Sequence, residues 1–314
     1  MVRVAVVVAG GGDRVVTALA PLLFRWSPTV VLQPQMPPAE QVADLAQTAD
    51  AVLVIGPRAR SPRTALAGPG ATAGERWVPT AWLPLVSLES IQRFALAAAR
   101  VHDRAATPGR LGVLSQRQPR FERLADRIVR QAQHTGVQVE RWTAYDMGRE
   151  ELVSRLHTGP ALGLYVGHGR PIGWVGYAGM RAHHLEPGTD AEPAGAIVSL
   201  TCKTASRRRT GLSFAEAIPL TAVAAAAVGA IEPTHHTANA RWAVRLAAAL
   251  PAAATIGDLL SQVVPHDPHA ASYRLLGDPT APLRDASQTA PLVGAIQTAP
   301  LVGAVHTTRT QEVA

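Results

Sequence analysis

The chain alternates short, continuously apolar runs with segments of helical spacing, and this alternation constrains its fold more than any other feature. Three of these runs are Ala51–Ile55, Ala161–Val166 and Val2–Val8, the last of which is apolar except for Arg3. Continuous apolar runs are typical of parallel strands that are buried on both faces. Strands that alternate with helices are typical of βαβ units. We therefore expect an α/β protein with a mostly parallel central sheet.

The pattern predicts two successive α/β series, with a surface loop rich in Gly, Ala, Arg and Pro between Gly56 and Pro79. The expected strands are Val2–Val8, Thr29–Leu32, Ala51–Ile55, Arg110–Leu114, Val137–Arg141, Ala161–Val166, Ala194–Leu200 and Ala222–Ile231. The expected helices are Arg14–Phe24, Ala39–Gln47, Leu88–Val101, Arg120–His134, Arg149–Leu156, a helix starting at Ser213, Ala238–Leu250 and Ile256–Val264. Ser87 or Ser90 is the expected N-cap of the third helix.

These elements predict a smaller N-terminal α/β subdomain over residues 1–105 and a second α/β domain over residues 106–283. The chain then changes character, because Gln288–Ile296 (QTAPLVGAI) is repeated as Gln297–Val305 (QTAPLVGAV). Two copies of so short a unit cannot form a solenoid. We expect residues 284–314 to be a loosely attached low-complexity tail, with a partner-binding peptide as the alternative.

The composition excludes several classes of protein. Of the 314 residues 47% are hydrophobic and 17% charged, which indicates a globular chain. The net charge of +7 comes almost entirely from Arg that is scattered except at Arg207–Arg209, so we expect a solvated basic surface and no nucleic-acid site. No apolar stretch of about 18 residues is present, so we expect no membrane span. A single cysteine and no secretory leader favour the cytoplasm, and the usage of Ala, Arg, Gly and Pro resembles that of a high-GC bacterium.

Two of the expected strands end next to residues with catalytic potential. Ala161–Val166 runs into Gly167-His168-Gly169, and Ala194–Leu200 runs through Thr201 into Cys202, the only cysteine. Catalytic groups in parallel sheets lie just beyond the carboxyl ends of the strands. Neighbouring strands would therefore place His168 and Cys202 side by side, and a thiol with a base is the minimum for nucleophilic catalysis. The alternative is that Cys202 is an inert core thiol and His168 a structural residue.

Such a site also needs donors for an oxyanion. A free thiol with a pKa near ~8.5 is only partly ionised at neutral pH, so a nearby base must activate it. Gly169 has no side chain and lets the backbone approach a substrate carbonyl. We therefore expect the amides of Gly169 and Cys202 to form the oxyanion hole.

The ordered motifs of the chain resemble those of the caspase-like (clan CD) cysteine peptidases, most closely the gingipain-type family, with CHAT-domain peptidases as relatives. The resemblance covers roughly Val78 to Leu283. Its motifs are Ala81–Leu85 followed by Ser87–Ser90, Gly167-His168-Gly169 with Trp174, Cys202, Ser213–Glu216 followed by Ala225–Ile231, and Tyr273–Pro279. It implies a caspase-hemoglobinase-like three-layer sandwich, with Cys202 as nucleophile and His168 as acid and base.

The resemblance also indicates where substrate binds. In this superfamily the residue that recognises the P1 side chain often follows the first catalytic strand, here at Ser115–Gln118. By analogy Arg117 would favour an acidic P1 residue, and the alternative is an exposed loop arginine with no such role. Asp146, with Asp190 and Glu192, could instead form an acidic pocket, so the P1 preference stays open. Trp174 is the third expected substrate contact.

Departures from the family limit the prediction. Metacaspases carry an Asp shortly before the Cys, whereas Ser199–Thr201 stand here, so calcium dependence is not expected. Neither the secretion signal nor the pro-region of the gingipains is recognised, so activation by a partner protein or by cleavage stays open. The adjacent pairs His183-His184 and His235-His236 lack metal-ligand spacing, and no metal or cofactor is expected.

The sequence therefore predicts an intracellular cysteine endopeptidase that cleaves protein or peptide substrates. Two other classes of function remain as alternatives. One is a catalytically silent caspase-like scaffold or regulator. The other is a nucleotide-binding α/β protein that uses the turn Gly10–Gly12, although this turn lacks the G-x-G-x-x-G pattern.

Overall fold

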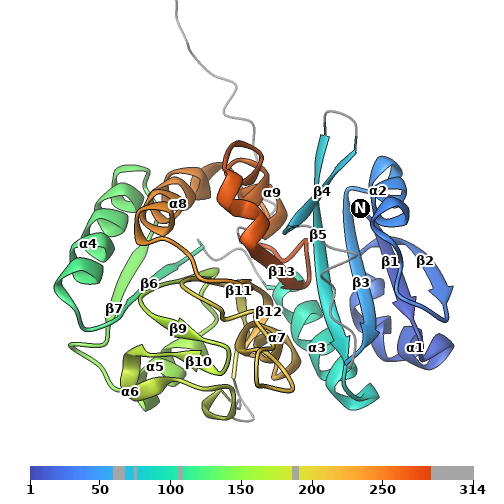
Figure 1. Ribbon diagram of the computed structural model, residues 1–314, viewed down its shortest axis with the longest axis horizontal. Helices are drawn as coiled ribbons and strands as arrows, with labels where there is room; N and C mark the ends of the chain where they lie inside the picture. Colours follow the sequence, from blue (N-terminus) through green and yellow to red (C-terminus); the bar gives the residue numbers. More distant parts are fainter. Residues whose placement is uncertain (59–67, 74–75, 105–108, 186–190, 284–314) are drawn as a thin grey trace, which may run out of the picture.

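The computed structural model describes residues 1–58, 68–73, 76–104, 109–185 and 191–283 (Figure 1). The predicted low-complexity tail with its repeat, and Asp190, lie outside the described residues. The strands are β1 (Arg3–Ala9), β2 (Ser27–Gln33), β3 (Ala51–Pro57), β4 (Gly70–Ala73), β5 (Arg76–Leu85), β6 (Leu111–Ser115), β7 (Val139–Thr143), β8 (Leu162–Val166), β9 (Gly169–Arg170), β10 (Gly173–Trp174), β11 (Ala194–Leu200), β12 (Ala224–Ala230) and β13 (Tyr273–Gly277). The α-helices are α1 (Gly12–Leu23), α2 (Ala39–Thr48), α3 (Leu88–His102), α4 (Pro119–His134), α5 (Arg149–Leu156), α6 (Gly176–Gly179), α7 (Phe214–Leu220), α8 (His236–Ala249) and α9 (Ile256–Ser261).

A single large sheet runs through the molecule in the order β2-β1-β3-β5-β13-β12-β11-β8-β6-β7, and β4 pairs with β5 beside this path. Neighbouring strands along the path are parallel except β12 and β13, which are antiparallel. Because β13 is parallel to β5, the strands β1, β2, β3 and β5 point opposite to β6, β7, β8, β11 and β12. The carboxyl ends of the two sets therefore lie at opposite edges of the sheet.

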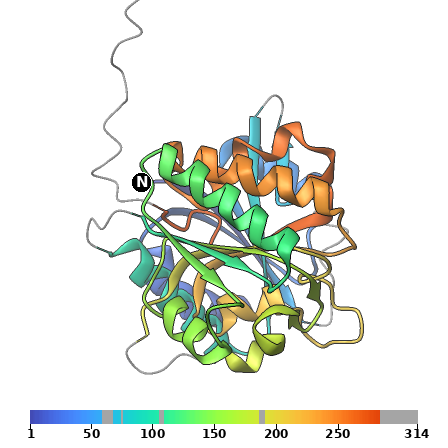
Figure 2. The same cartoon turned by 90° about the vertical axis from the view of Figure 1, so that its left-hand side faces the viewer.

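Helices cover both faces of the sheet and complete the expected three-layer α/β sandwich (Figures 1 and 2). One buried apolar cluster combines one face of the strands with side chains from α1, α3, α4, α8 and α9. A second cluster combines the other face with side chains from α2, α5 and α7. Strands buried on both sides explain why the sequence shows continuous apolar runs instead of alternation.

Local sequence signals for helix starts are confirmed. The Ser87 side chain accepts a hydrogen bond from the Ser90 amide and caps α3. The Ser213 hydroxyl accepts from the Glu216 amide, and the Glu216 carboxylate accepts from the Ser213 amide, which completes a capping box at α7. This second box fixes the end of the loop that follows Cys202.

The expected surface loop between Gly56 and Pro79 is wrong in its second half, which forms β4 and the first part of β5. Pro79 and Pro84 interrupt the apolar pattern of β5, and proline lacks the N–H that a strand interior normally donates. Strand β13 was also missed, because Arg274 is the second residue of a run of only five. The Arg274 guanidinium is accommodated by donating to the carbonyls of Ala271 and Tyr273.

Strand β13 joins the part of the sheet before residue 105 to the part after residue 109, so the sheet is continuous across the predicted domain boundary. The division at 105/106 stays a prediction about folding units. Over the described residues, no helix is long and apolar enough to cross a membrane, and no group of three or more His, Cys, Asp or Glu is arranged to hold a metal ion.

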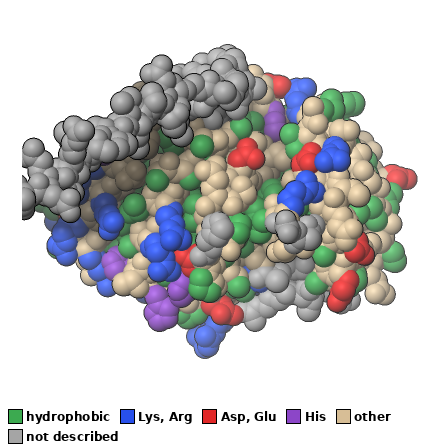
Figure 3. All heavy atoms as spheres, turned by 90° about the horizontal axis from the view of Figure 1, so that it is seen from above, with side chains coloured by type: hydrophobic (Ala, Val, Ile, Leu, Met, Phe, Trp, Pro, Cys, Tyr) green, Lys and Arg blue, Asp and Glu red, His purple; other side chains and the backbone are tan. Residues whose placement is uncertain are grey.

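The basic surface is less scattered than the sequence indicated. Arg123, Arg127 and Arg130 are exposed on α4 at spacings that place them on one face of the helix. Figure 3, which looks down on the top of Figure 1, shows basic side chains at the end of the molecule that carries α4. Part of the positive charge is therefore a stripe along one helix.

Candidate active site

The register of β8 and β11 places His168 and Cys202 next to each other at one edge of the sheet. The two strands are parallel, and their last paired residues are Val166 and Leu200. His168 and Cys202 each follow this pair by the same number of residues. Because paired strands lie about 4.8 Å apart, the loops that carry these residues leave the sheet as neighbours.

Gly169 shows how closely the two loops approach. A Cβ atom built on Gly169 would lie 2.6 Å from Thr201 Cγ2 and 2.7 Å from the carbonyl oxygen of Cys202. Contacts this short exclude every side chain, so glycine is required by the close approach and not by its backbone angles. The backbone after His168 therefore packs directly on the backbone at Cys202.

Cys202 is half-buried, and its sulfur contacts Thr234. The Thr234 amide donates to Sγ at 3.4 Å, and the carbonyl and hydroxyl oxygens of Thr234 both lie 3.7 Å from Sγ. An N–H aimed at sulfur stabilises negative charge there. Thr234 follows β12, so the strand next to β11 supplies the environment of the thiol.

A buried network holds Thr234 in place. The Asn239 amide on α8 donates to Thr234 Oγ1 at 2.9 Å and to the carbonyl of Leu200 at 3.1 Å. The Tyr273 hydroxyl on β13 donates to Asn239 Oδ1 at 2.7 Å. Burial raises the pKa of Tyr273, so its hydroxyl stays protonated and remains a donor. The network connects β13, α8 and the end of β11 directly beneath Cys202.

His168 is exposed and lies in a different set of contacts. Its ring packs edge-on against Phe121 with the centroids 5.3 Å apart, and its Nε2 accepts a hydrogen bond from the Arg120 guanidinium. The backbone amide of His168 donates to Gln116 Oε1 at 2.7 Å. Partial burial, then Arg120, then His236 lower the pKa of His168, so the imidazole is neutral at neutral pH and able to take a proton.

The thiol and the imidazole have separate partners in this structure. Among the described residues, the hydrogen bonds of the Cys202 sulfur go to Thr234, and that of the His168 ring goes to Arg120. In enzymes without substrate, catalytic hydrogen bonds are often long and form fully only when substrate binds. The strand register therefore places the two residues on neighbouring loops, and their side chains are not hydrogen-bonded to each other.

Two backbone amides at this edge are available as donors. The Val175 amide donates to the His168 carbonyl, so these two residues form a hydrogen-bonded pair that continues the antiparallel ladder of β9 and β10. The next pair, Gly169 with Trp174, is then a non-hydrogen-bonded pair. The Gly169 amide therefore points away from β10. Within the described part of the chain, the Cys202 amide makes no hydrogen bond to another backbone group. Neither of the two amides that the sequence predicted for an oxyanion hole is therefore used in a hydrogen bond between strands.

The residues expected to bind substrate are only partly brought to the site. Arg117 and Asp146 are both exposed and follow β6 and β7, whose carboxyl ends lie on the same edge as Cys202. The Arg117 guanidinium lies 4.7 Å above the ring of Tyr145, and Asp146 Oδ2 accepts from the Thr143 hydroxyl at 3.2 Å. Among the described residues, no hydrogen bond, ion pair or ring contact links Arg117 or Asp146 to His168 or Cys202.

Trp174 does not fit its expected role as a substrate contact. It is 2% exposed, its indole N–H donates to Ser199 Oγ at 2.9 Å, and it stacks on Tyr165 at 4.4 Å. The Tyr165 hydroxyl in turn donates to the carbonyl of His168 at 3.1 Å. The aromatic pair lies beneath the His168 loop and supports it from inside the core.

Glu192, one of the alternatives for an acidic pocket, lies at the wrong edge. It precedes β11, and its amide donates to the carbonyl of His157, at the end of the sheet opposite to Cys202. Its carboxylate pairs with Arg100 at 2.5 Å. Since β11 runs across the sheet, a residue before its start cannot reach a substrate held at its end.

Several residues around the site were missed from the sequence. Arg120, Thr234 and Asn239 have no motif of their own, because their importance comes from contacts between distant segments. His236 lies 5.4 Å from Phe121, the same ring that contacts His168. The sequence offered one usable signal for His236, because His235 and His236 follow the buried strand β12 just as His168 follows β8.

Comparisons with known proteins identify the family and the fold. The model of peptidase family C25 matches residues 96–284. A crystal structure of the Arg-specific cysteine proteinase gingipain R (RgpB) is similar with a TM-score of 0.68 and 14% identity, covering 89% of this chain and 78% of that chain. A complex of the pro- and mature domains of Porphyromonas gingivalis RgpB gives a TM-score of 0.66 at 13% identity, covering 89% and 79% of the two chains. A structure described only as a protease gives 0.65 at 12% identity, covering 90% and 78%. Curated protein sequences contain no match. The expected gingipain-like, caspase-type fold is confirmed.

Proposed function

This chain belongs to peptidase family C25, and we propose that within this family of cysteine peptidases it is an endopeptidase with Cys202 as nucleophile and His168 as base. The observation that carries the proposal is the shared register of β8 and β11, which ends both strands side by side. The tight packing of Gly169 on the Cys202 carbonyl supports it independently. A structural histidine and an inert thiol would need no such alignment.

The reaction follows from these positions. The neutral imidazole of His168 takes the thiol proton of Cys202, and Sγ attacks the carbonyl carbon of the scissile bond. The amides of Gly169 and Cys202 hold the resulting oxyanion. The imidazolium then gives its proton to the leaving amine, which departs and leaves a thioester. Water attacks the thioester, His168 takes a proton from it, and the acid product leaves with the thiol restored.

We also propose that the arrangement described above is a resting form. The Arg120 guanidinium occupies Nε2 of His168 and the thiol lies against Thr234, which supports an activation step before or during substrate binding. Binding of a partner protein or cleavage of the chain could each release His168 from Arg120 and the thiol from Thr234. RgpB has been solved as a complex of its pro- and mature domains. We propose that a protein partner likewise binds this chain and controls its activity.

The site of action is proposed to be the interior of the cell. The chain has one cysteine and so no pair for an intramolecular disulfide, which is the composition of proteins that do not depend on an oxidising compartment. Fractionation of cells that express the untagged chain tests this point. Recovery from the medium or the cell envelope would contradict it.

Cleavage of a degenerate peptide library tests the catalytic assignment. We expect Cys202→Ala to abolish cleavage and His168→Ala to lower kcat/KM by roughly 100- to 10,000-fold, the usual contribution of a general base. His183→Ala is the matched control, because His183 is exposed and its ring contacts His184 and neither His168 nor Cys202. Circular dichroism and thermal melting must show that each variant is folded. Cleavage that survives in folded Cys202→Ala would overturn the proposal.

A further inference from the structure

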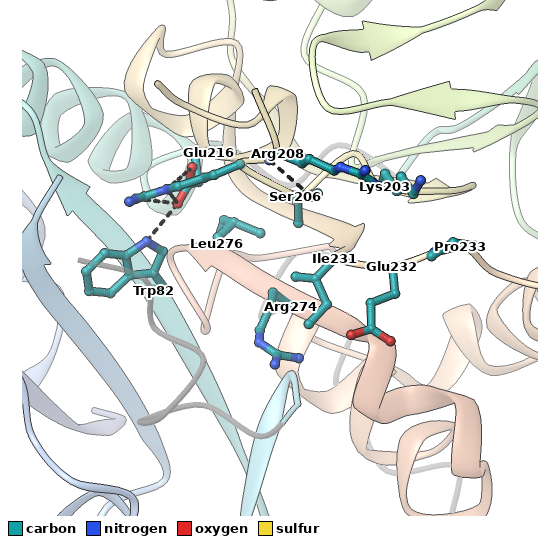
Figure 4. A pocket seen from close by; sticks show the side chains of 12 residues that line it. Trp82, Lys203, Ser206, Arg208, Glu216, Ile231, Glu232, Pro233, Arg274 and Leu276 are labelled. Carbon is teal, nitrogen blue, oxygen red and sulfur yellow. Dashed lines mark hydrogen bonds and ion pairs between the residues drawn. The ribbon is translucent and has the colours of Figure 1, made fainter. Parts of the chain in front are cut away.

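A cavity of about 510 Å³ opens beside the loop that follows Cys202 (Figure 4). Lys203 and Arg208 of this loop lie on one side of it, and Glu232 and Arg274 lie across from them. Arg207 of the same loop also lines the cavity. The loop is tied to the end of β12, since the Lys203 amide donates to the carbonyl of Glu232. The cavity therefore begins one residue after the proposed nucleophile.

One carboxylate of the cavity is fully engaged with its neighbours. Glu216 is 2% exposed and accepts from Trp82 Nε1 at 2.9 Å, from Arg207 Nε at 2.9 Å and from the amide of Ser213 at 2.9 Å. Arg207 Nη2 also pairs with it at 2.7 Å. The carboxylate thus neutralises Arg207 and holds it rigid, and it has no acceptor capacity left for a ligand.

The remaining charges of the cavity are mostly positive. In the part of the chain that the structure describes, the other charged side chains that line the cavity are Lys203, Arg208, Arg274 and Glu232. Among the described residues neither Lys203 nor Arg208 forms an ion pair. The Arg274 guanidinium is fixed by two backbone carbonyls at 2.8 and 2.7 Å, so its position is set before any ligand arrives. A preorganised cation in a partly desolvated site binds anions more strongly than a flexible surface cation.

The cavity also has an apolar floor. Ile231, Leu276 and the indole of Trp82 line it between the charged walls. An apolar floor with cationic walls fits a short methylene stem that ends in a carboxylate. A small inorganic anion would leave the floor uncovered.

We propose that this cavity is a substrate subsite that receives an acidic side chain, most favourably Glu, from a residue close to the scissile bond of the substrate. The inference rests on the proposed function, because Cys202 defines where the substrate chain lies. An extended chain advances about 3.3 to 3.6 Å per residue, so a substrate residue within a few positions of the bond reaches the cavity. The subsite is separate from the loop after β6, where Arg117 was expected to read the P1 residue.

The test compares pairs of peptides that differ only by Glu or Gln, with the pair placed in turn at each position around the cleaved bond. For the wild type we expect kcat/KM to favour Glu by about tenfold at one position, the size of a charge-assisted hydrogen bond. Arg208→Glu should remove or invert this preference, and Lys203→Gln should reduce it. Arg209→Glu is the matched control, because Arg209 is an exposed neighbour that does not line the cavity.

A binding arm separates this inference from the proposed function. The Cys202→Ala variant is titrated with the fluorescent Glu and Gln peptides, alone and combined with Arg208→Glu or Arg209→Glu. One outcome separates the two proposals: the wild type cleaves no peptide, Glu peptides bind more tightly than Gln peptides, and Arg208→Glu but not Arg209→Glu abolishes that difference. The proposed function then fails, and the site for an acidic side chain stands. A Glu to Gln ratio near one at every position, or equal effects of Arg208→Glu and Arg209→Glu, overturns the subsite.

Discussion

The two halves of the sheet have the same construction and opposite directions. In both halves parallel strands alternate with helices that bury their apolar faces. Strand β13, antiparallel to β12 and parallel to β5, reverses the direction between them. The carboxyl ends of β1, β3 and β5 therefore face away from the edge at which β8 and β11 end.

The residues that follow β1 differ in chemistry from those that follow β8 and β11. After β1 come Gly10, Gly11 and Gly12 with φ of 87°, 76° and 51°, a left-handed turn that favours glycine. After β8 and β11 come His168 and Cys202, with backbone amides beside them. Architecture alone therefore does not make a site, since function depends on the residues that follow the strands. The glycines that suggested a nucleotide site are accounted for by the turn.

The largest expected effect comes from breaking a buried hydrogen bond between the two halves, which adds to the strand pairing through β13. Trp82 belongs to β5 and Glu216 to α7, and their hydrogen bond crosses the junction. Glu216→Ala leaves Arg207 and the Trp82 indole without their buried acceptor, so the free energy of unfolding should fall by about 3 to 5 kcal/mol. Chemical denaturation measures this loss. Glu89→Ala is the control, because the Glu89 side chain is 83% exposed, and an equal loss there would contradict the account.

A smaller but specific effect is expected from Gly169→Ala. The added methyl group would meet Thr201 and the Cys202 carbonyl and push the two loops apart. Because this displaces one proposed oxyanion donor, kcat/KM should fall by about 100-fold or more. Gly148→Ala is the matched control, since a Cβ there meets nothing within 4 Å. Unchanged activity in Gly169→Ala would show that the two loops need not touch.

Asn239→Ala tests whether the network beneath Cys202 positions the thiol. The change removes the donor to Thr234 and Leu200 and the acceptor for Tyr273, so we expect kcat/KM to fall by about tenfold through loss of one or two buried hydrogen bonds. The rate of Cys202 alkylation should fall in parallel, which a loss of global stability alone would not produce. Thr237→Ala, exposed on the same helix, should leave both rates unchanged.

The smallest effect concerns the pH dependence of the reaction. Arg120 contributes to lowering the pKa of His168, so Arg120→Met should raise that pKa toward its ordinary value. The imidazole must be neutral to act as base, and the acidic limb of the kcat/KM profile should therefore move to higher pH. Arg130→Met, exposed at the far end of α4, should leave the profile in place. A shift toward lower pH would contradict the assignment of His168 as base.

The fold was predictable wherever one segment carried its own signal. The runs ending at Val166 and Leu200 and the capping box at Ser213 gave the strands and the helix start that frame the site. Strands β5 and β13 were missed because prolines and a buried arginine break the apolar pattern, and only pairing with distant strands makes them strands. Without β13 the reversal of direction between the two halves could not be inferred.

The position of the proposed site was predictable for the same reason. His168 and Gly169 follow β8 and Cys202 follows β11, as the sequence indicated, and their catalytic roles stay predictions. Trp174 was misassigned because a motif does not show burial, and its indole is in fact bonded to Ser199. Arg120, Thr234 and Asn239 act through contacts that form only after folding, and no local pattern announces them.

The central claim is that the sole thiol becomes a nucleophile because one imidazole serves it. The most direct measurement is the rate at which a peptidyl chloromethyl ketone labels Cys202, followed by mass spectrometry across pH in the wild type and in His168→Ala. We predict labelling at Cys202 alone, governed by a group that titrates below the ordinary histidine pKa, and a large loss of rate in His168→Ala. Equal labelling rates in the two proteins, or no labelling of Cys202 in the folded wild type, would contradict the account.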